Sequence, residues 1–497
     1  MNSAIVLGIV LLAVLSLWGL VDMLQRDNAV RRIYPLLGAF RTPLVDIGPK
    51  LRQYLFADDW EERPFNRNER AWVKGAATGK DPLQSFGSTY SLSESGNYLF
   101  ENSMFPSESH ELPDAYSPLV IGPGRPRPFV AGSLFNISAM SYGSLNKRAI
   151  SALSMGAKRA GCWHNTGEGG LSPYHQLGGG DVIFQMGTGK FGCRNDDGSL
   201  NEAKLREVAQ KVQAIEIKLS QGAKPGKGGI LPAEKVTAEI AAIRGVPVGK
   251  AVKSPNHHVE ISNLSQLLDF VAHCKSLVEV PVGIKFCLGN PDDAVALTAA
   301  MAKRNPQDLP DFITVDGGEG GTGAAPPALI DWTGLPVRQA LPMMHSLLLR
   351  HGLREHVCLI ASGKAVTGAG VCVLMALGAD FVNSARGFML TLGCIQSMRC
   401  HSGSCPTGIA THHPWRMRGL VVERGAANVK NYVEAIHHEV AMVCRALGLT
   451  DPRQIRPHHL RFVKSDGTAI PLEQHLDALM ARHGVPAIES SWAYPSM

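Results

Sequence analysis

The sequence lacks two features that would indicate a function directly, a cluster of basic residues and a dinucleotide-binding motif. Basic residues form no block: 49 Lys and Arg are spread along the chain against 43 Asp and Glu, and the net charge is only +6. Nucleic-acid binding normally needs clustered cations, so we do not expect it. No strand-like run is followed by GxGxxG with an acidic residue about twenty positions later, so a nicotinamide-binding Rossmann domain is not apparent.

One long hydrophobic run is present near the start. No ionisable residue interrupts Ala4 to Val21, and a helix over residues 4–22 would nearly match a hydrocarbon core of about 30 Å. No Lys or Arg precedes the run, no small-residue cleavage pattern follows it, and three arginines follow by residue 32. These flanks argue against a cleaved signal peptide. We expect a single-pass membrane protein with a cytoplasmic catalytic domain; a buried core helix is the alternative.

The cysteines are unevenly distributed. Cys394, Cys400 and Cys405 lie within CIQSMRCHSGSCPTG, whereas the other seven are scattered, mostly in apolar runs. Tetrahedral zinc needs four ligands, and three cysteines followed by proline fit an iron-sulfur cluster better. Because no fourth cysteine is near, the loop suits a three-iron cluster, or a four-iron cluster with a non-cysteine ligand. Three chance thiols are the alternative. Cytoplasmic thiols stay reduced, so a disulfide framework is not expected.

Short apolar runs alternate with helical patterns from about Pro118 onward. About eight such units imply parallel strands with right-handed crossovers. Each strand-like run ends in a loop rich in Gly, Ser, Thr, Lys or Glu, which favours a (β/α)8 TIM barrel over a doubly wound sheet. We therefore expect a transmembrane helix, an extension at 26–117, a barrel at 118–445 and a C-terminal extension at 446–497.

Three glycine-containing loops follow the last three predicted strands, at residues 316–323, 362–364 and 385–387. Glycine lets backbone N–H groups approach a phosphate closely, and the final strands of such barrels are a common phosphate position. Tight barrel corners are the alternative reason for these glycines. Since the cysteine loop follows directly, flavin mononucleotide (FMN) is the natural candidate, because a flavin can exchange single electrons with a cluster. The expected contacts are Gly317, Gly318, Gly321, Ser362, Gly363, Arg386 and Gly387.

Buried lysines are expected within two predicted strands. Lys218 in AIEIKLS and Lys285 in VGIKFC are each surrounded by apolar residues. An unpaired buried ammonium is costly, so each lysine should meet an anion. Beside a flavin, such a lysine would stabilise the reduced, anionic ring. A buried ion pair is the alternative for both residues.

Charged residues also occupy the middle loops. Lys224 and Lys227 lie on the glycine-rich run QGAKPGKGG, and Arg244 follows. Converging cations favour a dicarboxylate clamp, whereas a solvated basic loop is the alternative. Glu168, in HNTGEGG, could orient an amine or donate a proton, or could merely pair with a lysine. The pair at 257–258 is interpreted as a structural loop element rather than a metal site.

Several runs resemble, in order, the synthase domain of glutamate synthase: SAMSYGSLNKRAISAL, HNTGEGG, IEIKLSQGAKPGKGGILPAEKV, SPNHHVEISNLSQL, DGGEGGTGAAP and LGCIQSMRCHSGSCPTGIATH. The resemblance covers about residues 118–445 and extends to stand-alone FMN-binding members with an N-terminal hydrophobic segment. It implies a barrel with FMN, a 3Fe-4S cluster on the three loop cysteines, and reductive amination of 2-oxoglutarate to glutamate. It assigns Glu168, Lys224, Arg244 and Gln221 to 2-oxoglutarate and its imine, and Ala139, Met140, Ser141 and Thr322 to the flavin.

Two departures from that family matter. No glutaminase domain with a nucleophilic cysteine is recognisable, so ammonia would be free or come from a glutaminase subunit. Ile230 stands where the family usually has glutamine, and one lost polar contact typically costs ~1–3 kcal/mol. The electron donor would be ferredoxin-like or a reductase subunit. The alternatives are a membrane-linked FMN dehydrogenase of another 2-oxo or 2-hydroxy acid that reduces quinone, and a non-catalytic electron-transfer subunit.

Overall fold

The computed structural model describes residues 3–80, 83–107 and 118–485. The chain divides into two compact units, Met1–Ala71 and Trp72–Met497, and each is described here by itself.

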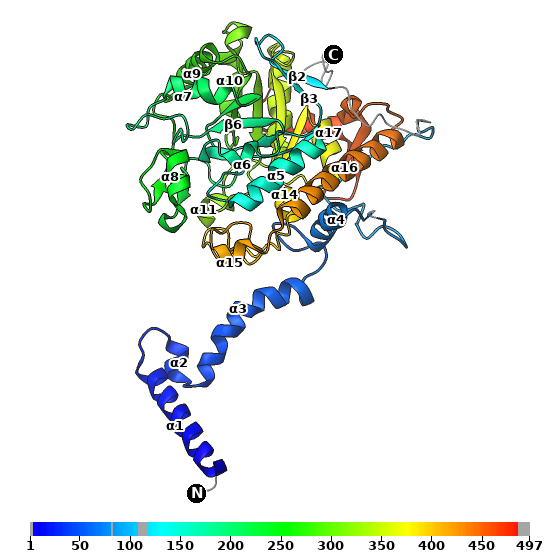
Figure 1. Cartoon of the computed structure of the whole chain (residues 1–497). Helices are drawn as coiled ribbons and strands as arrows, with labels where there is room; N and C mark the ends of the chain where they lie inside the picture. The colour runs from blue at the N-terminus through cyan, green and yellow to red at the C-terminus, as the bar shows by residue number, and fades with distance from the viewer. Residues whose placement is uncertain (1–2, 81–82, 108–117, 486–497) are drawn as a thin grey trace. The chain divides into compact units, whose positions relative to one another are not determined.

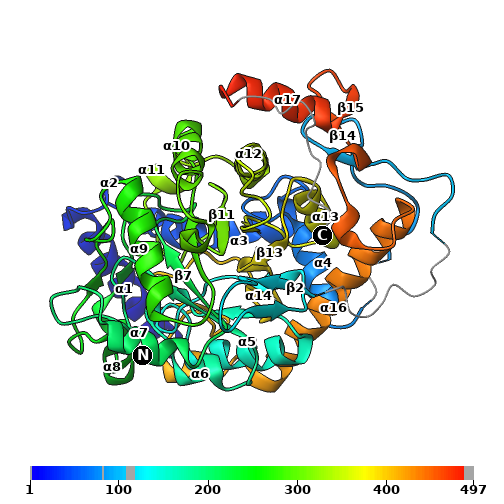
Figure 2. The same ribbon diagram turned by 90° about the horizontal axis from the view of Figure 1, so that it is seen from above.

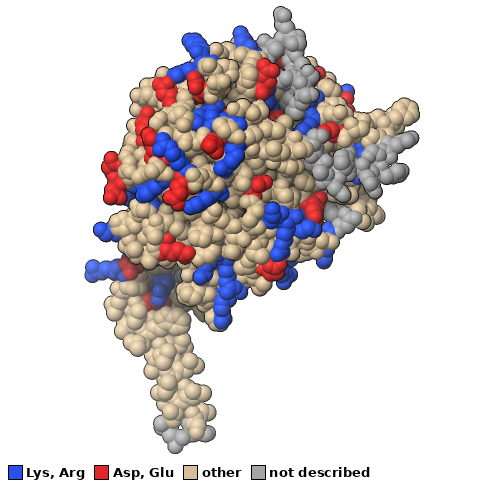
Figure 3. Space-filling view, turned by 45° about the horizontal axis from the view of Figure 1, so that its top comes forward, with Lys and Arg blue, Asp and Glu red and all other residues tan. Residues whose placement is uncertain are grey.

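The first unit is helical. It contains α1 (Ser3–Leu24), α2 (Ala29–Ile33), the single turn η1 (Leu37–Phe40), α3 (Arg41–Leu51) and the π-helical turn η2 (Arg52–Phe56). α1 is long and apolar enough to cross a membrane, with a mean hydropathy of 2.8. Its one ionisable residue, Asp22, is buried, and the visible face of this helix in Figure 3 carries no charged side chain. α4 (Arg67–Ala77) follows and runs into the second unit.

Eight parallel strands of the second unit close into a barrel in the order β10-β11-β12-β13-β4-β5-β6-β7. This confirms the predicted (β/α)8 architecture; seven of the eight strands lie in mainly apolar runs of the sequence, whereas β5 is the polar pair His164–Asn165. Most are buried along their whole length because helices cover the outside and side chains fill the inside. The strands are β4 (Phe135–Ile137), β5 (His164–Asn165), β6 (Val182–Met186), β7 (Ala214–Lys218), β10 (Val282–Phe286), β11 (Phe312–Asp316), β12 (Cys358–Ser362) and β13 (Phe381–Ser384).

Helices surround the barrel, as Figure 2 shows from above. The largest helix pair is α5 with the 25-residue α16, and their close approach needs glycine at Gly156, where a Cβ would lie 2.5 Å from Cβ of Val429. Asn146 starts α5 by accepting hydrogen bonds from two backbone N–H groups. The main helices are α5 (Lys147–Ala160), α7 (Glu202–Ala209), α9 (Leu264–Leu277), α10 (Pro291–Met301), α12 (Val337–Arg350), α13 (Gly368–Ala376), α14 (Arg386–Thr391) and α16 (Val422–Ala446).

A hairpin of β2 (Leu119–Ile121) and β3 (Phe129–Ala131) packs at the N-terminal ends of the barrel strands. Ile121 and Phe129 belong to one buried apolar cluster with Trp163, Phe312 and Phe381, which lie at the starts of barrel strands or just before them. In Figure 1 the hairpin lies at one end of the barrel and α8 (Ala238–Arg244) with α15 (Pro414–Met417) at the other. Access to the barrel interior is therefore left to the C-terminal strand ends.

The residues that flank the barrel pair with one another. β1 (Tyr98–Phe100) forms an antiparallel pair with β14 (Leu460–Val463), which also pairs with β15 (Ala469–Pro471). α17 (Leu472–Arg482) follows this sheet. The predicted N-terminal and C-terminal extensions are thus partly one structure.

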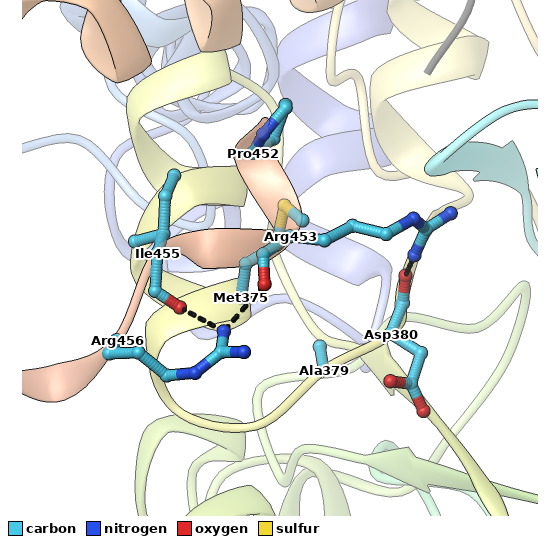
Figure 4. A pocket seen from close by; sticks show the side chains of 7 residues that line it. All are labelled: Met375, Ala379, Asp380, Pro452, Arg453, Ile455 and Arg456. Carbon is cyan, nitrogen blue, oxygen red and sulfur yellow. Dashed lines mark hydrogen bonds between the residues drawn. The ribbon is translucent and has the colours of Figure 1, made fainter. Parts of the chain in front are cut away.

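A small pocket lies at the start of β13, at the N-terminal end of the barrel (Figure 4). Arg453 donates a hydrogen bond to the carbonyl of Asp380 (3.0 Å), and Arg456 donates to the carbonyl of Arg453 (2.6 Å). The Asp380 carboxylate accepts from Arg354 (2.7 Å) and from the backbone N–H of Leu359 (2.7 Å). The contact of Arg453 with Asp380 fastens the C-terminal segment to the barrel, so we interpret this pocket as structural.

Candidate functional site

A layer of polar side chains crosses the barrel interior below the predicted site. Glu216 on β7 is almost fully buried and accepts hydrogen bonds from Asn165 (2.9 Å), Gln185 (2.6 Å) and Thr314 (2.7 Å). The three donors lie on different strands, so the carboxylate joins opposite sides of the barrel. Side chains two positions apart on a strand share a face, and Lys218 therefore points inward as well, one layer nearer the C-terminal end.

Lys218 is the centre of the predicted site. Its Nζ lies 2.8 Å from Oε2 of Glu168 and 2.6 Å from Oε1 of Gln221. Glu168 belongs to the loop after β5, where Gly167 adopts a φ of +63° and a Cβ would lie 2.7 Å from the backbone N of Ser141. Only glycine fits such a position. Nε2 of His258 donates a hydrogen bond to the carbonyl of Lys218 (2.9 Å).

The cations around Glu168 control its ionisation. Burial by itself raises the pKa of Glu168, but Lys218, with smaller contributions from Lys224 and Arg244, lowers it to about 2. Burial lowers the pKa of Lys224, and Glu168 opposes that shift. Burial also lowers the pKa of Arg244 to about 10, although the Glu168 carboxylate acts to raise it. At neutral pH the site therefore contains one carboxylate among three cations.

Arg244 is fixed by the ends of α8. Thr237 caps the helix N-terminus and Gly245, with φ +65°, ends it directly after the arginine. The guanidinium donates to the carbonyl of Tyr142 (3.1 Å) and lies 5.2 Å from the ring centroid of Phe191. Its Nε is buried without a hydrogen-bond partner among the residues that the structure describes. A buried guanidinium with an unused donor is suited to receiving an anion.

A pocket opens beside this group at the C-terminal strand ends. Glu168, Lys218, Gln221, Lys224, Lys227 and Asn256 are among the residues that line it. The structure thus brings the predicted residues Glu168, Gln221, Lys224 and Lys227 to one pocket, whereas Arg244 is not among its lining residues. Ile230, expected to replace a polar contact, is half exposed and does not line the pocket.

Asp316 connects the lysine loop to the glycine-rich loop after β11. Its Oδ1 lies 3.6 Å from Nζ of Lys285, and its Oδ2 accepts a hydrogen bond from the N–H of Gly222 (2.8 Å). Lys285 and Lys218 are register partners on β10 and β7. A Cβ on Gly222 would lie 1.7 Å from the carbonyl oxygen of Gly317, so the two loops touch through their backbones. Both buried lysines have the ion-pair partners that the sequence left as an alternative.

The predicted flavin residues lie on neighbouring loops around the barrel's C-terminal end. Arg386 donates to the carbonyl of Glu319 (2.6 Å), and a Cβ on Gly321 would lie 2.7 Å from the arginine side chain. Ala139, Met140 and Ser141 follow β4, where Met140 N–H donates to the carbonyl of Asn165. Part of the glycine content has a packing reason, since a Cβ at Gly318, Gly363 or Gly387 would meet protein atoms at 2.6–3.0 Å. Ser362 ends β12, and Thr322 is half-buried.

The cysteine loop follows α14. Lys235 lies beneath it and donates to the carbonyls of Cys400 (2.9 Å) and Ala410 (3.3 Å). Burial raises the pKa of Cys405, but backbone N–H groups of Ala410, Thr407 and Ile409 and the Thr407 hydroxyl lower it overall. N–H donors of this kind stabilise a thiolate ligand. Cys394 and Cys400 are near enough to Cys405 to influence each other's charge.

Within the described part of the chain, no group of three or more His, Cys, Asp or Glu side chains is close enough to hold a single metal ion. The ligands of a multi-iron cluster bind different iron atoms and so lie further apart than the ligands of one ion. The donor set, with three thiols, N–H groups facing one of them and a nearby cation, fits such a cluster. The cations and backbone loops at the strand ends likewise fit a phosphorylated flavin.

Comparison with known proteins agrees with this geometry. Residues 111–450 match the family model described as the conserved region in glutamate synthase. The chain belongs to the glutamate synthase family. It is a glutamate synthase-like oxidoreductase, of the class that acts on CH–NH2 donors.

Several relatives share much of the sequence. The glutamate synthase large subunit-like protein YerD of Bacillus subtilis is 38% identical, over 95% of this chain and 97% of the relative. The archaeal glutamate synthase [NADPH] of Methanocaldococcus jannaschii is 37% identical over 64% of this chain, which spans 60% of that relative. Among solved structures, a mandelate oxidase with (S)-2-phenylpropionate matches 79% of this chain and 97% of its own, with 16% identity and a TM-score of 0.44.

Sequence reasoning missed three residues of this site. Glu216 was detectable, because it lies two positions before Lys218 and must share its inward face. Asp316 begins the glycine-rich run and ends β11, which is where functional side chains of a barrel are expected. Lys235 had no sequence signal, because its contact with the cysteine loop joins residues 165 positions apart.

Proposed function

We propose that this glutamate synthase family member contains FMN and a 3Fe-4S cluster and reductively aminates 2-oxoglutarate to glutamate. The observation that carries the proposal is the Glu168 carboxylate, ionised among Lys218, Lys224 and Arg244 at the mouth of the barrel. The reaction joins 2-oxoglutarate and ammonium with two electrons and two protons, and it releases glutamate and water.

The cations supply sites for the two carboxylates of the substrate. Lys224 lies on the pocket wall, and Arg244, which lies near enough to Glu168 to lower its pKa, is buried with an unused Nε donor. Charge-assisted hydrogen bonds from these groups would hold the substrate in one orientation. Lys227 is exposed on the same loop and could attract the anion before it is bound.

Glu168 would orient the nitrogen. The sequence left open whether this carboxyl donates a proton or orients an amine, and a pKa of about 2 favours the second role. A carboxylate that stays ionised at neutral pH attracts ammonium and keeps the imine protonated, and a protonated imine accepts hydride more readily than a neutral one. Gly187 and Gly229 let the backbone pack closely against Glu168, because a Cβ at either position would come within 2.7 Å of the glutamate side chain.

The cofactors would be held by neighbouring loops. Arg386 and the loops after β11, β12 and β13 would bind the phosphate of FMN, while Lys218 and Lys285 would face its ring; Cys394, Cys400 and Cys405 would bind the cluster. When bound, the flavin supplies the two-electron reduction and the cluster supplies single electrons. Lys218, already paired with Glu168, would place a positive charge beside the ring.

The remaining partners are proposed from membership of the glutamate synthase family. Ammonia would be free or delivered by a glutaminase subunit, and electrons would come from a ferredoxin-like donor or a reductase subunit. α1 would anchor the protein in a membrane with the barrel in the cytoplasm, because its 22 residues are apolar and uninterrupted apart from Asp22 near the end. The apolar helix also favours a second candidate, an FMN dehydrogenase of another 2-oxo or 2-hydroxy acid that reduces quinone.

One experiment separates these functions. The full chain is purified anaerobically in detergent, its flavin is reduced chemically, and flavin absorbance is followed after 2-oxoglutarate and ammonium are added. Reoxidation with formation of glutamate is the expected result. A flavin that stays reduced with these substrates, but is reoxidised by a quinone analogue, would support the second candidate. In the same assay Lys224→Ala should weaken the binding of 2-oxoglutarate more than Lys227→Ala, its matched control, because both lysines line the pocket but only Lys224 is buried.

A further inference from the structure

The segment that follows α1 cannot move freely away from it. Asp22, in the last turn of α1, is buried; its carboxylate pairs with Arg31 of α2 and accepts a hydrogen bond from the N–H of Leu36 (3.0 Å). The four-residue connection is also fixed, since Oε1 of Gln25 accepts from the N–H groups of Asp27 (2.9 Å) and Asn28 (2.8 Å). α1, α2 and η1 therefore form one rigid structure.

Close packing and backbone strain support this rigidity. Leu36 adopts a φ of +65°, which is costly for a branched side chain and is found where surrounding contacts enforce it. A Cβ on Gly38 would lie 2.7 Å from Cα of Arg31, and a Cβ on Gly19 would touch Leu36 and Pro35. The residues after α2 thus lie beside the last turn and a half of α1.

This arrangement leaves apolar side chains exposed. Leu37 is 73% exposed and Phe40 64% exposed, and the pattern continues through α3 and η2 to Phe56, which is 77% exposed. The exposed set comprises Ile33, Tyr34, Leu37, Phe40, Leu44, Val45, Ile47, Leu51, Tyr54, Leu55 and Phe56. A soluble surface rarely carries so many large apolar residues in one short segment.

Charge accompanies these apolar residues. Between Arg26 and Arg52 the chain carries six basic and two acidic residues, and Arg26, Arg32, Arg41, Lys50 and Arg52 are exposed. Exposed apolar and aromatic side chains interleaved with cations are typical of a segment that lies in the headgroup layer of an anionic bilayer.

We propose that residues 29–56 are a second membrane-contacting element, which lies in the headgroup region of an anionic lipid surface next to the end of α1. The inference rests on the proposed membrane anchor. α1 is about 33 Å long at 1.5 Å per residue and so uses its whole length to span the hydrocarbon core. A segment locked to its last turns must then lie at the interface, where the exposed apolar side chains reach the acyl boundary and the cations meet lipid phosphates.

The test uses the full chain in vesicles of phosphatidylcholine and phosphatidylglycerol, with a photoreactive benzoylphenylalanine placed at one position at a time. Phe40 and Leu44 report on the proposed element, Leu12 on the anchor, and exposed Val259 of the barrel unit is the negative control. Lipid adducts at Leu12, Phe40 and Leu44, but not at Val259, are expected. The double variant Arg32→Glu, Arg41→Glu should lower the adduct yield at Phe40 several-fold and leave that at Leu12 unchanged.

Each other result has a distinct meaning. Lipid adducts at Leu12 without adducts at Phe40 and Leu44 would refute the interfacial element and leave the anchor intact. Crosslinks from Phe40 or Leu44 to barrel peptides would show that the segment covers its own protein, and would also refute it. The absence of a lipid adduct at Leu12 would refute the anchor and this proposal with it. That result would not affect the proposed chemistry at Glu168.

Discussion

Glu168 and Lys218 are joined across the mouth of the barrel by a 2.8 Å ion pair, although 50 residues separate them in the sequence. The lysine ends β7, and the glutamate lies in the loop after β5. The pair fixes the carboxylate at the edge of the pocket and keeps it ionised.

Replacing that carboxylate should reduce catalysis without releasing the flavin. Glu168→Gln keeps the shape of the side chain but removes its charge, so the cationic imine loses a charge-assisted interaction of about 1.5–3 kcal/mol. We expect kcat/KM with 2-oxoglutarate and ammonium to fall about 10- to 100-fold, with flavin content unchanged by absorbance. Unchanged turnover would mean that Glu168 is only the structural partner of Lys218.

Glu168 should also contribute to acid stability. Its folded pKa of about 2 lies below the ordinary value of 4.5, so its contribution to the free energy of unfolding is complete above pH 4.5 and is lost as the pH falls toward 2. The difference in unfolding free energy between the wild type and Glu168→Gln should therefore shrink on acidification, as measured by denaturant titration from about pH 6 downward. A difference that is constant or grows would contradict the depressed pKa.

The contact between Gly222 and Gly317 should be intolerant of any side chain. In Gly222→Ala the new Cβ would lie 1.7 Å from a carbonyl oxygen, so the lysine loop or the glycine-rich loop must move. Strain of this kind costs about 1–3 kcal/mol, and we expect a KM for 2-oxoglutarate raised about tenfold and weaker FMN retention on dialysis.

Gly289→Ala is the matched control for Gly222→Ala. It lies in the loop after the neighbouring strand β10, where a Cβ would meet nothing within 4 Å. Equal effects of the two substitutions would show that loop flexibility, rather than the backbone contact, determines substrate binding.

The cysteine loop gives a prediction that is independent of substrate. Cys400→Ala should abolish the iron-sulfur signal in electron paramagnetic resonance of the full chain while most FMN remains bound, because the barrel loops are untouched. Cys162→Ala, at a buried cysteine whose pKa burial raises to about 12, should leave iron content unchanged. Retention of iron in Cys400→Ala would show that the ligand assignment is wrong.

Most barrel strands were predictable because they are short apolar runs followed by polar loops; β5, the polar pair His164–Asn165, is the exception. The sequence predicted that each lysine within a strand needs an anionic partner, because an unpaired buried ammonium is costly. Their partners were not: Lys285 meets Asp316, and Lys218 meets Glu168, through closure of the barrel. Pairing between distant segments has no local signature, which also explains why β1 and Lys235 were missed.

The pairing of β1 with β14 has a practical consequence for dividing this protein. β1 precedes the barrel and β14 follows it, and the paired residues are more than 350 positions apart. Strand pairing therefore holds together the two segments that flank the barrel. A fragment cut to the family-matched residues 111–450 would lack both strands and would lose the contact of Arg453 with the carbonyl of Asp380. Expression of the isolated enzyme should therefore keep residues 98–100 and 460–471 together, because neither flank is a separable tail.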